Sequence, residues 1–276
     1  MRIIDSEIIT KEIKEAVQTA NFSLEQNLLK KIRNAVKKEN SALGKNVLNE
    51  LIENAKIARR EKIPICQDTG IVIIFAEIGN EVSIDGNLND AVNYGIKIGY
   101  NEGFLRNSIV EDPFKRKNTG DNTPAIIYTD IVPGNKLDLE ILIKGAGSEN
   151  MSRIKMFKPT STKKEITAFI METVQNAGAN ACPPYVLGIG IGGTFEKAAF
   201  LSKKALVKDN NEDNDIKDFE RKILEEVNKT GIGPAGLGGN ITALDVNILT
   251  HPCHIASLPV AVNINCHASR HLKISI

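Results

Sequence analysis

Residues 182–194 read Cys-Pro-Pro-Tyr-Val-Leu-Gly-Ile-Gly-Ile-Gly-Gly-Thr, and this stretch says most about the fold. Its apolar run at 186–191 has the length of a buried strand. The pattern G-x-G-x-x-G overlaps the end of that run at 188–193, and a helix is expected at 195–206. A strand followed by glycines and then a helix is typical of a dinucleotide-binding turn. The same succession of strand and helix predicts a mixed α/β body.

Helical and strand-like stretches alternate loosely along the rest of the chain. A capping-box pattern at 23–26 and helical spacing of apolar residues predict helices in the first sixty residues, one of them at 43–60, and Pro64 ends this block. The further predicted elements are strands at 71–75, 125–131 and 137–143, helices at 89–100, 164–176 and 219–229, and an exposed polar loop at 208–216. We therefore predict one domain over 1–276 with a mixed α/β (α+β) fold, in which a helical N-terminal region (about 1–62) packs on a mixed α/β body (about 63–276).

Composition and charge limit the classes of function. The chain has 276 residues, of which 42% are hydrophobic, and its 35 Lys+Arg against 34 Asp+Glu give a net charge of +1. These values are ordinary for a globular protein, and the balanced charge argues against nucleic-acid binding. The longest apolar stretch, at 71–76, is too short to cross a membrane, and no signal peptide is visible at the N-terminus. We expect a cytoplasmic protein.

Three glycine-containing stretches, at 144–150, 188–193 and 231–239, predict close approach of backbone to a ligand or to another segment. The match at 188–193 lacks an acidic residue at the end of a following strand, because the candidates Asp209 and Glu212 fall in the polar loop. A nucleotide-binding protein is therefore one alternative. An anion such as a carboxylate would use the same backbone N–H groups.

The four cysteines are widely spread, unlike those of a disulfide scaffold. Cys66, Cys182 and Cys266 each lie in a polar, turn-forming context where a core residue would be unusual, and three converging thiolates would suit an iron–sulfur cluster with one open iron. All four histidines lie in the last 26 residues around Cys253 and Cys266. Zinc is the alternative ligand of such residues, although the spacing is not that of a zinc finger.

Five motifs together resemble the class I, iron–sulfur-dependent fumarate hydratases and the related L-tartrate dehydratases, and most specifically the separate alpha subunit of the two-subunit form. The resemblance runs in order from about residue 5 to 270. The motifs are Cys66-Gln-Asp-Thr-Gly70, Lys144-Gly-Ala-Gly-Ser-Glu-Asn150, the stretch at 182–194, Gly233-Pro-Ala-Gly-Leu-Gly-Gly239, and His251-Pro-Cys-His-Ile-Ala-Ser-Leu-Pro-Val-Ala-Val262 leading to Cys266.

The resemblance implies a fold of the iron–sulfur hydro-lyase alpha type and a [4Fe–4S] cluster whose open iron is a Lewis acid in the reversible hydration of fumarate to (S)-malate, a tricarboxylic acid cycle reaction. Cys253 is then a spare thiol. The implied cluster ligands are Cys66, Cys182 and Cys266, the implied catalytic residues are Asp68 and His254, and the implied substrate-binding residues are Gln67, Arg106, Ala146 and Gly147.

The resemblance also implies a partner. The Lys-Gly-Ser/Thr-rich segment that supplies the remaining catalytic groups belongs to the beta region, and this chain ends at Ile276 without one. We therefore expect activity only with a beta subunit of the same enzyme, in a heterotetramer acting on a dicarboxylate. The alternatives are an L-tartrate dehydratase alpha subunit, with the same cluster and elimination chemistry, and a non-catalytic metal-binding structural subunit.

Overall fold

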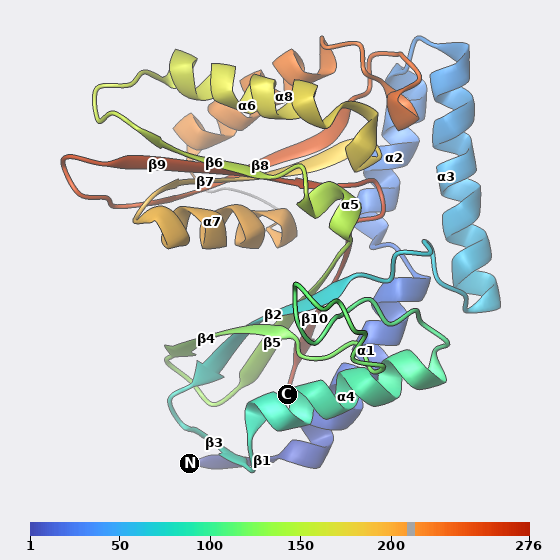
Figure 1. Cartoon of the computed structure of the whole chain (residues 1–276), viewed down its shortest axis with the longest axis vertical. Coiled ribbons are helices and arrows are strands. Elements are labelled where there is room, and N and C mark those ends of the chain that lie inside the picture. The colour runs from blue at the N-terminus through green and yellow to red at the C-terminus, as the bar shows by residue number, and fades with distance from the viewer. Residues whose placement is uncertain (209–212) are drawn as a thin grey trace. The chain divides into compact units, whose positions relative to one another are not determined.

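The computed structural model describes residues 1–208 and 213–276, and its mixed content of helices and mixed sheets confirms the predicted fold class. The chain forms two compact units that interleave in the sequence (Figure 1). Unit 1 comprises residues 1–26, 54–146 and 270–276, and unit 2 comprises residues 27–53 and 147–269. The assignment of 1–276 to a single domain stays a prediction.

Unit 1 is built on a four-stranded sheet in the order β10-β5-β2-β4, formed by β2 (Ile71–Gly79), β4 (Ile126–Val132), β5 (Leu137–Lys144) and β10 (Arg270–Ser275). Strand β2 runs parallel to β4 and antiparallel to β5. Helices α1 (Ser6–Phe22) and α4 (Leu88–Glu102) pack together beside this sheet (Figure 1). A small parallel pair, β1 (Arg2–Asp5) with β3 (Val82–Asp85), completes the unit.

The core of unit 1 forms because buried side chains alternate along the strands and small residues lie between the helices. Alternate β2 residues Val72, Ile74 and Ala76 belong to the same buried cluster as the inner faces of α1 and α4. A Cβ added at Gly99 of α4 would lie 2.5 Å from the Val17 side chain of α1. Glycine at this position therefore allows the two helices to approach closely.

Unit 2 is built on a second four-stranded sheet in the order β6-β9-β7-β8, formed by β6 (Arg153–Phe157), β7 (Tyr185–Gly192), β8 (Ala243–His251) and β9 (Leu258–Asn265). Strand β7 runs parallel to β8 and antiparallel to β9. Helices α6 (Lys163–Ala177) and α8 (Asn214–Asn228) cover one face and α7 (Phe195–Lys204) covers the other (Figure 1).

Helix α2 (Gln26–Lys38) lies almost entirely in unit 2, and the boundary between the units falls within α3 (Ala42–Glu61). The short elements are α5 (Ala146–Glu149) and three 3₁₀ turns, η1 (Gly178–Ala181), η2 (Ala205–Val207) and η3 (Pro234–Gly236). No helix in the described part of the chain combines the length and the apolar character needed to cross a bilayer.

The glycine pattern at 188–193 has a different setting from the one predicted. Gly188 and Gly190 lie inside strand β7 and do not form a turn after it. A Cβ on Gly188 would lie 2.1 Å from the Ser202 carbonyl oxygen, and one on Gly190 would lie 2.1 Å from the Ala198 carbonyl oxygen. These glycines allow the backbone of α7 to pack directly on the sheet. Asp209 and Glu212 lie outside the described residues.

The predicted helices and strands are present, with α8 beginning at Asn214 and not at 219 and β2 continuing to Gly79 and not ending at 75, whereas β1, β3, β6, β8, β9 and β10 were not predicted. Two local predictions need correction. Ser23 is the C-cap of α1, and α2 begins only at Gln26. The polar stretch at 208–216 is not all loop, because α8 begins at Asn214 with the Asp213 side chain accepting hydrogen bonds from the first-turn N–H groups. Residues 209–212 of that stretch are not described.

Candidate active site

The Asp68 carboxylate is the centre of the candidate site in unit 1. It lies in the segment between α3 and β2, where Oδ1 accepts a hydrogen bond from the Gly70 N–H at 3.0 Å. Oδ2 accepts a second from the Ala146 N–H at 2.8 Å. A Cβ added at Gly145 would lie 3.0 Å from Asp68 Oδ2, so glycine there leaves room for the carboxylate. The motif around Ala146 is thereby joined to the motif around Asp68.

Arg106 adjoins the same carboxylate. Its Nη2 lies 3.5 Å from Asp68 Oδ1, and its side chain is 58% exposed. The Thr69 hydroxyl donates a hydrogen bond to the Arg106 carbonyl oxygen and so ties the arginine's backbone to the segment that carries Asp68. A guanidinium has five N–H donors in a planar fork, which matches the geometry of a carboxylate ligand.

Buried polar residues behind this segment hold its backbone. The side chain of Tyr100 is fully buried on α4, and its hydroxyl donates to the Thr69 carbonyl oxygen at 2.6 Å. Burial raises the pKa of Tyr100 to about 12, so the hydroxyl stays a hydrogen-bond donor at neutral pH. Asn122 Nδ2 donates to the Gly70 carbonyl oxygen at 3.1 Å. Sequence reasoning missed both residues, although the helical spacing of Tyr100 from Ile96 placed it on an apolar face.

Cys66 and Gln67 precede Asp68 in the same segment. The Cys66 thiol lies 3.6 Å from Gln67 Oε1, which accepts its weak hydrogen bond. Cys66 is partly buried. Unit 1 thus brings together Cys66, Gln67, Asp68, Arg106 and Ala146, five of the nine residues predicted for the site.

Cys182 lies on a tight turn in unit 2. It is the C-cap of η1 in a left-handed conformation with φ 52°, and its N–H donates to the Ala179 carbonyl oxygen at 3.0 Å. Its own carbonyl oxygen accepts a hydrogen bond from the His267 N–H at 3.3 Å. That bond brings the turn that carries Cys266 next to the turn that carries Cys182.

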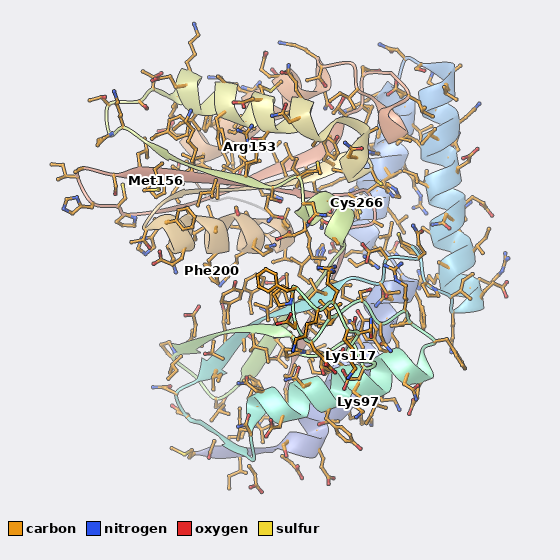
Figure 2. The ribbon with its side chains drawn as sticks, in the orientation of Figure 1. Lys97, Lys117, Arg153, Met156, Phe200 and Cys266 are labelled. Carbon is orange, nitrogen blue, oxygen red and sulfur yellow. The ribbon has the colours of Figure 1, made fainter. Side chains whose placement is uncertain are left out.

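Cys266 directly follows β9, and Figure 2 shows it at the end of the strand near α5. Helix α5 is held there by Glu149, which pairs with Lys203 and accepts a hydrogen bond from Asn263 Nδ2 at 3.3 Å. Gly147, in the same helix, approaches η1, since a Cβ on it would lie 3.7 Å from the Asn180 carbonyl oxygen. Gly147, Cys182 and Cys266 therefore gather at one end of the unit 2 sheet.

His254 is not part of this gathering. It lies in the exposed turn at 252–257 between β8 and β9, where its Nδ1 accepts a hydrogen bond from the Ala256 N–H at 3.1 Å. The turn precedes β9 and Cys266 follows it, and β9 has eight residues. At about 3.4 Å per residue, the two ends of the strand are roughly 25 Å apart. Within this unit, the structure does not bring His254 to the cysteines.

The donor set suits an iron–sulfur cluster. None of the four cysteines forms a disulfide, and Cys66, Cys182 and Cys266 are each at least partly exposed. Three thiolates are the ligand type that such clusters use. Across 1–208 and 213–276, no three His, Cys, Asp or Glu side chains form a ready group for a single metal ion. Cys66 belongs to unit 1 and the other two thiols to unit 2. Within unit 2, the turns that carry Cys182 and Cys266 are in contact through the hydrogen bond from the His267 N–H to the Cys182 carbonyl oxygen.

Comparison with known proteins points to one family. Residues 10–275 match the family model described as fumarate hydratase (fumerase). A protein of Methanocaldococcus jannaschii named "Putative L(+)-tartrate dehydratase subunit alpha" is 44% identical over 80% of this chain and 80% of its own length. The L(+)-tartrate dehydratase subunit alpha of Escherichia coli is 31% identical over 75% of this chain and 70% of its own length. The same figures hold for the Shigella sonnei protein of that name.

Proposed function

Because this chain belongs to the fumarate hydratase (fumerase) family, we propose that it is the alpha subunit of an iron–sulfur hydro-lyase that interconverts fumarate and (S)-malate. The observation that carries the proposal is the arrangement around Asp68. One short segment presents a thiol, an amide and a carboxylate, and the carboxylate lies between the Ala146 N–H and the Arg106 guanidinium. A dicarboxylate substrate needs such neighbouring anion-binding and proton-transfer groups.

Cys66, Cys182 and Cys266 are the proposed ligands of a [4Fe–4S] cluster. When bound, the cluster supplies an open iron that polarises the substrate hydroxyl and a carboxylate as a Lewis acid. Cys253 lies in the same turn as His254, at the far end of β9 from Cys266, and takes no part in this ligand set.

The remaining residues bind and orient the substrate. Arg106 pairs with a substrate carboxylate through the donors of its guanidinium fork. The backbone at Ala146 and Gly147 and the amide of Gln67 lie beside that carboxylate and fix its rotation. Asp68 holds or accepts a proton at a carboxylate oxygen, and its two backbone hydrogen bonds fix the direction of that oxygen. His254 stays a proposed catalytic residue. Because it lies at the far end of β9 from Cys266 of its own chain, it would act beside the reacting carbons bound by a second alpha chain of the heterotetramer.

The enzyme acts with a partner. The names of the relatives, which specify a subunit alpha, support a separate beta subunit that completes the active site. We propose a heterotetramer of two alpha and two beta chains. Four cysteines without a disulfide and a cluster with an open iron suit a reducing compartment, and we place the enzyme in the cytoplasm.

L-tartrate dehydratase is the second candidate, and the names of the relatives favour it. The cluster ligands and the elimination of water would be the same, and only the pocket for the second substrate hydroxyl would differ. Turnover of malate and of L-tartrate by the alpha–beta complex separates the two. Our proposal expects malate to be preferred by at least about tenfold in kcat/KM, and a preference for tartrate of that size would replace it.

The first experiment tests the cluster on the purified chain. After anaerobic reconstitution, we expect about four irons and four sulfides per chain, and a change in the EPR spectrum of the reduced cluster when malate is added. Cys66→Ser, Cys182→Ser and Cys266→Ser should each lose the cluster, whereas Cys253→Ser is the matched control and should keep it. Iron that stays bound in all three ligand variants, or a chain that binds none even with the beta subunit, would refute the ligand set.

A second experiment tests the shared active site. The alpha chain with its cluster should show no hydration of fumarate until the beta chain is added. Full turnover by alpha alone would contradict the proposed division of the site.

A further inference from the structure

Glu39 is a buried carboxylate that no part of the proposed chemistry uses. It lies in the link between α2 and α3, where the side chain is 1% exposed. Its oxygens accept hydrogen bonds from four backbone N–H groups. These belong to Asn40 and Ser41 at 2.8 Å each, Asn240 at 3.1 Å and Ile241 at 2.9 Å. Burial alone would raise the pKa of Glu39, but these hydrogen bonds lower it overall, so the carboxylate stays charged at neutral pH.

Asn240 and Ile241 form the end of the glycine loop, which we define as residues 231–241. The loop folds back on itself, with the Gly238 N–H donating to the Ile232 carbonyl oxygen at 2.9 Å. Gly239 has φ 127°, and a Cβ on it would lie 2.6 Å from Glu39 Oε1. The glycine is therefore needed for the carboxylate to reach its two donors in the loop. Asn240 completes the junction, since its Nδ2 donates to the Lys38 carbonyl oxygen at 3.0 Å.

The tip of the glycine loop packs on the turn that carries Cys182. The Ala235 N–H donates to the Pro183 carbonyl oxygen at 2.8 Å. On the other side of Cys182, a Cβ added at Gly236 would lie 2.4 Å from the Ala179 Cβ, so the two backbones are in close contact. The tip thus contacts the chain both before and after Cys182.

We infer that Glu39 is a positioning residue for Cys182, because it fixes the end of the glycine loop whose tip holds the Cys182 turn. The inference rests on the proposed function in so far as Cys182 is a cluster ligand. A glutamine in place of Glu39 has one acceptor oxygen where the carboxylate has two, and its NH₂ group would face backbone donors. The loop would then lose hydrogen bonds that are buried and charge-assisted.

The first test is hydrogen exchange of the cluster-free chain, which needs no activity. In Glu39→Gln we expect the amides at 233–241 and 178–184 to exchange at least about tenfold faster, with those of β7 and β9 unchanged. Glu172→Gln is the matched control, because Glu172 is an exposed carboxylate of unit 2 that pairs with Arg153 on the surface. Unchanged exchange at 178–184 in Glu39→Gln would overturn the inference.

The second test links the turn to the metal. With the cluster loaded, Glu39→Gln should release iron to a chelator at least about tenfold faster than the wild type and the Glu172→Gln control. A variant that loosens at 178–184 but keeps iron as long as the wild type would also overturn the inference. If the wild-type chain binds no cluster even with the beta subunit, the proposed function fails, while hydrogen exchange still decides whether Glu39 holds the Cys182 turn.

A third variant covers the case in which Glu39→Gln unfolds the whole of unit 2. Gly236→Ala leaves Glu39 intact and pushes the loop tip away from Ala179 directly. We expect it to speed exchange at 178–184 and iron release, with the amides of Asn240 and Ile241 still protected. Normal iron retention in Gly236→Ala would show that the loop tip does not position the ligand and would refute the inference.

Discussion

Replacement of Gly188 by alanine tests whether the glycine pattern at 188–193 is a packing site or a nucleotide-binding turn. In the structure, Gly188 lies in the middle of β7 and faces α7. The Cβ of an alanine would lie 2.1 Å from the Ser202 carbonyl oxygen, whereas ordinary contact begins at 3.4 Å. Helix α7 would have to retreat by roughly 1.3 Å, because a helix backbone cannot move aside as a flexible side chain can.

Overpacking of this kind costs about 1–3 kcal/mol, and we expect the upper part of that range because the clash is with backbone. For a protein of this size, 2–3 kcal/mol corresponds to a fall in Tm of roughly 5–10 °C. Alanine loses less backbone entropy on folding than glycine does, but this gain offsets at most about 1 kcal/mol of the cost.

The assay is thermal unfolding followed by circular dichroism, with NAD titration of the native protein beside it. Gly147→Ala is the matched control, because its Cβ would meet only the Asn180 carbonyl oxygen at an ordinary 3.7 Å, and its Tm should change little. A Gly188→Ala protein as stable as the wild type would refute the packing explanation. Tight NAD binding that Gly188→Ala abolishes would support the nucleotide-binding alternative.

Four further predictions concern the site and its supports. Asp68→Asn should lower kcat by about 100-fold or more in the alpha–beta complex with little change in Tm, as steady-state kinetics and thermal unfolding would measure, and near-normal turnover would remove Asp68 from the catalytic set. Tyr100→Phe should cost about 1–2 kcal/mol through the lost hydrogen bond to Thr69. The stabilising contribution of neutral Tyr100 is present below its ordinary pKa of 10.0 and is lost as the pH rises through about 12. The wild type should therefore lose stability over this pH range and Tyr100→Phe should not, as urea unfolding at several pH values would measure. The contribution of Glu39 has the opposite sign, since it is present above the ordinary pKa of 4.5 and is lost as the pH falls through the lowered value of the folded state. The gap in stability between the wild type and Glu39→Gln should therefore be larger at pH 7 than at pH 3, and an equal gap would contradict the charged, hydrogen-bonded carboxylate. Air exposure of the loaded enzyme should abolish turnover, and iron with thiol should restore it, whereas full activity after prolonged exposure would argue against an open iron.

Local patterns predicted the elements that have a strong periodicity of their own. The apolar faces of α3 and α4 and the apolar run of β2 depend on spacing within one segment, and a sequence displays that spacing directly. Strands β8, β9 and β10 lie among histidine, cysteine and asparagine motifs that read as turns, and sequence reasoning missed them. These segments are strands because they pair with β7 and β5, and the hydrogen bonds of that pairing stabilise a conformation that their local propensity did not predict.

The candidate site was predictable where neighbours in the sequence are neighbours in space. Cys66, Gln67 and Asp68 are consecutive, and Asp68 contacts Arg106 and Ala146, which belong to other stretches singled out in the sequence. The supports were not predictable. Tyr100 and Asn122 donate hydrogen bonds to the carbonyl oxygens of Thr69 and Gly70, which follow Asp68. The type of a residue does not indicate which distant carbonyl group it will bind.

The sequence by itself determined the family, the helix and strand propensities and the residues that we propose as ligands of a cluster and a dicarboxylate, because these depend on residue type and short-range order. Only the tertiary structure decided that Gly188 and Gly190 serve helix packing, that His254 and Cys266 lie at opposite ends of one strand, and that Glu39 binds a loop 200 residues away. Such contacts arise only when sheets and helices pack. They join groups that are far apart along the chain, so no local sequence pattern indicates them.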